Sequence, residues 1–119
     1  MATSINNLAQ LYKDQGKQAE AEPLHKRALA IRKKTLGPDH PNVAISLNNL
    51  ALVHHAQEQY AKAEPLYKRA LAIHEKAVGP NHPHVAVTLE NMAKLYMKMG
   101  RDEEAKKLLD RAKRIRASQ

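Results

Sequence analysis

The sequence contains no cysteine, no phenylalanine and no tryptophan. The absence of cysteine excludes disulfides, thiolate metal sites and cysteine nucleophiles together. Hydrophobic residues make up 43% of the chain and include four tyrosines, so any core must be built from mainly small and aliphatic side chains. Because such side chains suit closely packed helices, the composition predicts a folded helical protein.

Long apolar runs are also missing. No stretch approaches the roughly 18 apolar residues of a membrane-spanning helix, and the N-terminus lacks a basic region followed by an apolar one. We therefore expect no membrane partner and a cytoplasmic location. Twenty lysines and arginines against 12 acidic residues give a net charge of +8. This charge would attract acidic peptides, nucleic acid and anionic lipid alike, so the net charge alone does not identify the class of partner.

An internal repeat organises the 119 residues. A shift of 42 residues places residues 1–42 on residues 43–84 with 23 identities, including the motif ALAI at 28–31 and 70–73. A third unit continues more loosely from Asn91 to Ile115. A repeat period of this size is typical of a solenoid.

Each unit is predicted to form two helices, because its apolar residues recur at helical spacing. Gly37 and Gly79 stand where a left-handed cap would end a second helix. Gly16 and Gly100 stand in the turn within a unit, where the middle unit has Glu58. The expected helices lie near residues 2–14, 18–35, 42–56, 60–77, 83–98 and 101–116.

Prolines mark the helix starts. The histidine-proline pairs at 40–41 and 82–83 place proline at the first position of a helix, and the histidines are expected to cap it or to pack across repeats. Pro23 and Pro65 instead fall in the first turns of second helices, where each removes a backbone donor. A slight kink or a late helix start is expected there.

These motifs resemble the tetratricopeptide repeat. Ala51, Ala63, Ala70, Leu47 and Leu50 reproduce the small and large apolar residues at which the two helices of such a repeat touch. The family's usual period is about 34 residues. The longer connector at 37–41, with the motifs NNLA and KRALAI, resembles the repeats of kinesin light chains and their bacterial relatives.

The resemblance implies an all-α fold, a right-handed α-solenoid of three tandem helix-turn-helix hairpins with six helices. A single array would cover residues 1–119, with repeats at 1–36, 42–78 and 84–119. The first helices would line a concave groove that binds an extended peptide. The groove positions that the resemblance implies are Asn6, Gln10, Lys13, Asn48, Leu52, His55, Glu90, Lys94 and Met97.

The predicted groove combines amides, lysines and apolar side chains. Asn6 and Asn48 each offer a donor and an acceptor, which suits the main chain of an extended peptide. Lys13 and Lys94 add positive charge, and Leu52 adds apolar contact. We therefore expect a protein or peptide ligand that is acidic and carries an apolar anchor. The sequence does not identify that partner.

No catalytic residue, metal site or cofactor is expected. The adjacent pair His54 and His55 points in directions about 100° apart on a helix, whereas helical metal pairs use a spacing of three or four residues. His82 and His84 lie in a connector with no carboxylate to complete a set. No phosphate-binding loop occurs, and no nucleophile, base and orienting acid can be assembled, so we expect no enzyme activity.

Two other functions remain in competition with peptide binding. The chain begins without a histidine-proline start, so an uncapped first hairpin would expose Ile5, Leu8 and Tyr12. This predicts a structural or self-associating fragment of a larger scaffold, forming a homodimer or stacking end to end. RNA binding is permitted by the charge but disfavoured, because the chain has no aromatic platform on which bases could stack.

Overall fold

The computed structural model describes residues 18–118 and contains five helices in that range. Their boundaries agree within one residue with five of the six helices expected from the sequence. The remaining expected helix, near 2–14, lies outside the described residues. The five helices are α2 (Gln18–Leu36), α3 (Pro41–Ala56), α4 (Tyr60–Val78), α5 (Pro83–Lys98) and α6 (Asp102–Ala117).

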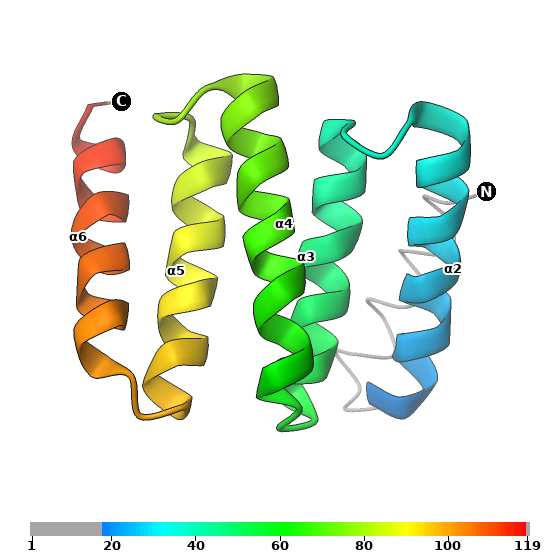
Figure 1. Ribbon diagram of the computed structural model, residues 1–119, viewed down its shortest axis with the longest axis horizontal. Helices are drawn as coiled ribbons and strands as arrows, with labels where there is room; N and C mark the ends of the chain where they lie inside the picture. The colour runs from blue at the N-terminus through cyan, green and yellow to red at the C-terminus, as the bar shows by residue number, and fades with distance from the viewer. Residues whose placement is uncertain (1–17, 119) are drawn as a thin grey trace.

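The helices follow one another along the long axis of the molecule in chain order from α2 to α6 (Figure 1), and α3 also contacts α5. The most extensive packing joins α3 to α4 and α5 to α6, which are the two helices of a hairpin in each case. α2 packs on α3, and α4 packs on α5, so the hairpins stack on one another. The described part of the chain is therefore an all-helical array with no strand.

The histidine-proline pairs start α3 and α5 as predicted. His40 and His82 are the N-cap residues, and a proline follows each of them at the first helical position. The Nδ1 atom of His40 accepts a hydrogen bond from the backbone N–H of Asn42 at 3.0 Å. His82 Nδ1 accepts from the N–H of His84 at 3.1 Å. Each cap satisfies a backbone donor that the first turn of a helix leaves unpaired.

Positive φ angles mark the ends of the helices. Gly37 and Gly79 have φ angles of 94° and 93°. The ψ angle of Gly79 is 155°, so the chain is extended there and does not form the left-handed helical cap expected from the sequence. That region of backbone space is open essentially only to glycine. Glu58 has a φ angle of 63° and is the only described residue other than glycine with positive φ.

The expected late start at proline does not occur. α4 begins at Tyr60, five residues before Pro65, and α2 contains Pro23 inside its described span. Pro65 is the sixth residue of α4, so the helix loses one hydrogen bond, to the carbonyl of Ala61, and continues through the proline.

Small side chains let the helices approach closely. Ala51, Ala63, Ala93 and Ala105 are fully buried in one cluster, and Tyr67 fills the space between them. Burial raises the pKa of Tyr67. This agrees with the small and large apolar positions that the resemblance to tetratricopeptide repeats singles out.

A polar joint ties the last two hairpins together. The Tyr96 hydroxyl donates to Glu64 at 3.0 Å, and the Arg101 guanidinium donates to both oxygens of Glu64 at 3.0 Å. Arg101 also lies 4.1 Å above the centre of the Tyr96 ring. Partial burial acts to raise the pKa of Glu64, but hydrogen bonds from Arg101, Lys68 and Tyr96 outweigh it and hold that pKa below its usual value.

Candidate functional site

A hollow lies between α3 and α5, the first helices of the two hairpins. Its volume is about 220 Å³. Apolar side chains and amides share its lining. Ile45 and Val87 are 38% and 44% exposed, so apolar surface is open to solvent there. The lining residues are Ile45, Asn48, Asn49, Leu52, His74, His84, Val87 and Asn91.

Asn48 lines the hollow and also joins its two walls. Its Nδ2 atom donates to the Thr88 hydroxyl at 3.0 Å, and that hydroxyl donates to the carbonyl of His84 at 3.2 Å. The Oδ1 atom of Asn48 is buried and accepts no hydrogen bond from the described residues. The side-chain N–H of Asn48 is therefore used in a hydrogen bond within the fold, whereas its side-chain oxygen has no hydrogen-bond donor among the described residues.

Two further amides, Asn49 and Asn91, belong to the lining although the groove predicted from the sequence did not include them. Both are half-buried, and within residues 18–118 neither side chain makes a hydrogen bond. The sequence does contain a signal for them, because asparagine recurs at the 42-residue period as Asn7, Asn49 and Asn91. Each of these residues directly follows a predicted groove position. They provide donors and acceptors that the fold does not use.

A positively charged cluster surrounds His55, which belongs to α3. The His55 ring is half-buried and meets the Tyr60 ring edge-on, with centroids 5.5 Å apart. Burial lowers the pKa of His55, and the neighbouring Lys98 and Lys94 of α5 lower it further. Three predicted groove residues, His55, Lys94 and Met97, therefore lie on the two helices that form the hollow, and Met97 is 48% exposed.

Glu90 takes part in a different contact. Arg116 of α6 donates from Nε and from one terminal nitrogen to its two oxygens, at 2.9 and 2.7 Å. The hydrogen bonds from Arg116 hold the pKa of Glu90 below its usual value. The carboxylate is thus already neutralised inside the chain, and Glu90 does not line the hollow.

Three histidines gather at the other side of the hollow. The rings of His74 and His84 are 5.3 Å apart, and those of His82 and His84 are 4.6 Å apart. Burial lowers the pKa of His74, and the charges of His84 and His82 lower it further. Within the described residues, no three histidine or acidic side chains form a group that could bind a metal ion.

The predicted site residues thus fall into four groups. Asn48 and Leu52 line the hollow, while His55, Lys94 and Met97 lie elsewhere on its helices. Glu90 pairs with Arg116. Asn6, Gln10 and Lys13 lie outside the described residues. None of the described helices combines the length and hydrophobicity of a membrane span.

Comparison with known proteins agrees with this architecture. The family model "Tetratricopeptide repeat" matches residues 1–76 and again residues 47–118. No curated protein sequence gives a significant match.

Solved structures resemble the whole array. The crystal structure of BtubC (BKLC) from P. vanneervenii is 33% identical over 98% of this chain and 47% of that chain, with a TM-score of 0.90. Two crystal structures of Podosopora anserina putative kinesin light chain nearly identical TPR-like repeats are 32% and 31% identical, each with a TM-score of 0.87. They are matched over 97% of this chain and 54% and 55% of theirs. This chain spans about half the length of these three relatives. It therefore belongs to the tetratricopeptide repeat family, and its repeats are of the kinesin light chain kind.

Proposed function

We propose that the chain binds an extended peptide segment of another protein across α3 and α5. Tetratricopeptide arrays are scaffolds for protein–protein interaction, generally without catalytic activity, and stacked repeats offer extended surfaces to a ligand. The observation that carries the proposal is the hollow of about 220 Å³ between α3 and α5. A hollow lined by apolar groups with a few polar ones is the usual form of a binding site.

The lining suggests how the peptide is held. Leu52 and the exposed Ile45 and Val87 would contact an apolar anchor side chain. Asn49 and Asn91, which the fold leaves without hydrogen bonds among the described residues, would donate to and accept from the peptide main chain. These amides lie one repeat apart and line the same hollow, so both can contact one peptide.

The ligand is proposed to be acidic because of the charges beside the hollow. Lys94 and Lys98 are exposed and lie close enough to His55 to lower its pKa. Neither lysine forms an ion pair with a carboxylate among the described residues, although the charge of Lys94 helps Arg116 to lower the pKa of Glu90, one helical turn away. A peptide carboxylate would provide that partner at the rim, where charge pairs speed association and select between ligands.

The complete array is proposed to be a right-handed solenoid of six helices. Its repeats would cover residues 1–36, 42–78 and 84–119, and Asn6, Gln10 and Lys13 of the first unit would extend the same binding surface. A cytoplasmic location remains part of the proposal.

The proposal is tested by selecting peptides from a random display library on the immobilised chain and measuring their affinities for variants. Lys94→Gln combined with Lys98→Gln removes the rim charge, and Lys106→Gln combined with Lys107→Gln is the matched control on α6. We expect the rim variant to lose about tenfold in affinity, the equivalent of 1.4 kcal/mol, and the control less than about twofold. Equal losses would show that only net charge matters.

A second variant tests the amides. Replacing Asn49 and Asn91 with alanine is expected to weaken binding while leaving the helical circular dichroism unchanged, because these side chains make no hydrogen bonds within the described fold. Asn48→Ala would not separate binding from stability, since it also removes the hydrogen bond from Asn48 to Thr88 within the fold. Unaltered peptide affinity in the double variant would remove the amides from the mechanism.

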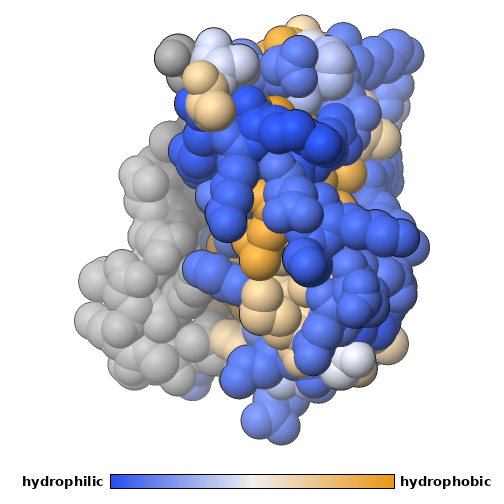
Figure 2. Space-filling model, turned by 90° about the vertical axis from the view of Figure 1, so that its left-hand side faces the viewer, coloured by the Kyte–Doolittle hydropathy of each residue, from blue (hydrophilic) through white to orange (hydrophobic). Residues whose placement is uncertain are grey.

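Self-association is the competing function, and the end face of the array favours it. Figure 2 shows hydrophobic side chains in the middle of the face that α6 presents, surrounded by hydrophilic ones. A further hairpin or a second copy could cover such a patch. Sedimentation over a range of concentrations separates the alternatives, because a strict monomer contradicts self-association and leaves peptide binding intact.

A further inference from the structure

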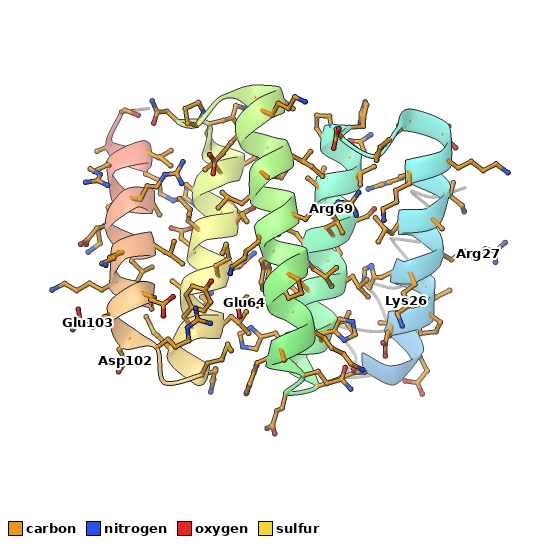
Figure 3. The ribbon with its side chains drawn as sticks, viewed as in Figure 1. Lys26, Arg27, Glu64, Arg69, Asp102 and Glu103 are labelled. Carbon is orange, nitrogen blue, oxygen red and sulfur yellow. The ribbon has the colours of Figure 1, made fainter. Side chains whose placement is uncertain are left out.

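Basic side chains cover the outer surface of α2 and α4, the second helices of their hairpins. Figure 3 shows Lys26 and Arg27 on α2 and Arg69 on α4. Arg27, Lys34, Arg69 and Lys76 are exposed, and Lys33 is half-buried. We refer to these five residues, Arg27, Lys33, Lys34, Arg69 and Lys76, as the basic strip.

Two other lysines on the same helices are neutralised by ion pairs, whereas the basic strip is not. Lys26 pairs with Glu22 at 3.2 Å, and Lys68 pairs with Glu64 at 3.1 Å, each one helical turn away. In the part of the chain that the structure describes, no carboxylate lies within ion-pair distance of any member of the basic strip. The strip therefore presents uncompensated charge on the second helices of two successive hairpins.

The internal repeat shows what fits this surface. At the joint between α4 and α6, Arg111 donates to Glu75 at 3.4 Å. The residues 42 positions earlier in the sequence are Lys33 of α2 and Arg69 of α4. The joint between α2 and α4 therefore has a lysine where the joint between α4 and α6 has the carboxylate of Glu75. Burial lowers the pKa of Lys33, and the charge of Arg69 lowers it further, which shows that the like charges repel one another.

We propose that a carboxylate from an acidic segment of a partner protein binds between Lys33 and Arg69, in the place that Glu75 takes beside Arg111. The remaining members of the basic strip attract neighbouring acidic residues of the same segment. This surface lies on different helices from the hollow between α3 and α5, so it is a second interaction site.

The chemistry of the surroundings favours an acidic polypeptide over other polyanions. The exposed uncharged residues of α2 and α4 include Ala30, Ala72, Pro23 and Pro65, and the large apolar side chain exposed among the described residues of these helices is Leu36, at 41%. One such side chain does not form the broad apolar face with which a helix enters a lipid bilayer. No exposed aromatic ring stands among them for nucleic acid bases to stack on. A guanidinium next to an ammonium is well suited to a carboxylate, and Glu75 with Arg111 provides the internal example.

The test uses a fluorescein-labelled oligo-glutamate peptide and the variant Lys33→Glu, which supplies the missing carboxylate from within the chain. Lys113→Glu on α6 changes the net charge equally and is the matched control. Fluorescence anisotropy is expected to show at least about fivefold weaker binding for Lys33→Glu, against less than about twofold for Lys113→Glu. Equal losses for the two variants would overturn the proposal.

A second readout tests the geometry. Lys33→Glu should raise the thermal midpoint of the chain above both the wild type and the control, because it restores the pairing seen at the joint between α4 and α6. An unchanged or lower midpoint would mean that the two side chains do not meet, and would overturn the proposal. Tighter binding to phosphatidylserine vesicles or to a single-stranded oligonucleotide, with the same dependence on Lys33, would also overturn it.

The rim variant Lys94→Gln with Lys98→Gln keeps the two binding sites distinguishable. It is expected to retain oligo-glutamate binding that depends on Lys33, while it loses affinity for the peptides selected on the groove. If the rim variant abolishes oligo-glutamate binding and Lys33→Glu does not, the acidic ligand belongs to the groove and the basic strip has no such role.

Discussion

Replacing Glu58 with glycine is expected to stabilise the protein. Glu58 stands in the turn between α3 and α4 with a φ angle of 63°, which side chains of L-amino acids rarely adopt. Its counterpart one repeat later is Gly100, with a φ angle of 76°. A side-chain carbon added at Gly100 would meet no atom within 4 Å, so any strain at this turn position comes from the backbone alone.

The magnitude follows from two opposing terms. The left-handed conformation costs an L-residue roughly 1–2 kcal/mol. Glycine loses about 0.5–1 kcal/mol more conformational entropy on folding than other residues. With the middle of each range, the net gain for Glu58→Gly is about 0.75 kcal/mol, which corresponds to a rise of about 2–6 °C in the midpoint of thermal unfolding for a chain of this size.

Thermal unfolding followed by circular dichroism measures the change, and Gly100→Ala gives the converse. We expect Gly100→Ala to lower the midpoint by a similar amount. Urea unfolding should give the same order of stability for the three proteins. A midpoint that stays unchanged or falls in Glu58→Gly would refute the backbone explanation and would indicate that the Glu58 side chain stabilises the fold by other means.

Three further predictions concern the joints and the core. Tyr96→Phe removes the hydrogen bond to Glu64 and should lower the free energy of unfolding by about 1 kcal/mol in urea titrations, while a loss near zero would mean that the bond is not formed in solution. Burial and the neighbouring His84 lower the pKa of His74, so the unfolded chain binds this proton more tightly, and stability should decline as the pH falls below about 6.5. A His74→Gln variant should show a shallower decline in the same measurement, and an equal slope would exclude His74 as its source. Ala51→Leu inserts a larger side chain at a fully buried position and should cost about 1–3 kcal/mol; calorimetry showing no loss would indicate a looser core.

The two joints between hairpins differ in chemistry. The second joint is held by Tyr96, Glu64 and Arg101, whereas the equivalent residues of the first joint are His54, Glu22 and Gln59. His54 Nδ1 lies 2.7 Å from the Gln59 side-chain oxygen, and its Nε2 lies 3.9 Å from Glu22. Gln59 thus contacts His54 instead of donating to the glutamate as Arg101 does, and the hydrogen bonds between arginine and glutamate of the second joint have no counterpart in the first. Repeat-to-repeat variation here changes the strength of a joint without changing the fold.

The fold was largely predictable because its signals are local. Histidine-proline pairs cap α3 and α5, glycines end the second helices, and the 42-residue repeat assigns the helices to hairpins. The two incorrect predictions, the late helix start at Pro65 and the helical cap at Gly79, also concern local backbone structure. The helical propensity of the residues before Pro65 outweighs the single donor that it removes, and the connector after Gly79 needs an extended ψ angle that a helical cap would not give.

The site was less predictable because it depends on contacts between distant residues. Asn48 and Leu52 line the hollow, and the resemblance to tetratricopeptide repeats is what placed both of them among the groove positions. Glu90 pairs with Arg116, 26 residues away, and only the packing of α6 on α5 brings them together. His74 belongs to the hollow because the end of α4 approaches the start of α5, which no local pattern indicates.

The most direct test of the central claim is to map amide chemical shifts while a library-selected acidic peptide is added to the labelled chain. Peptide binding across α3 and α5 predicts the largest shift changes at Asn49, Leu52, Val87 and Asn91, with smaller changes along the basic strip. Changes confined to α2 and α4, or to the end face of α6, would contradict the claim that the hollow between α3 and α5 is the principal binding site.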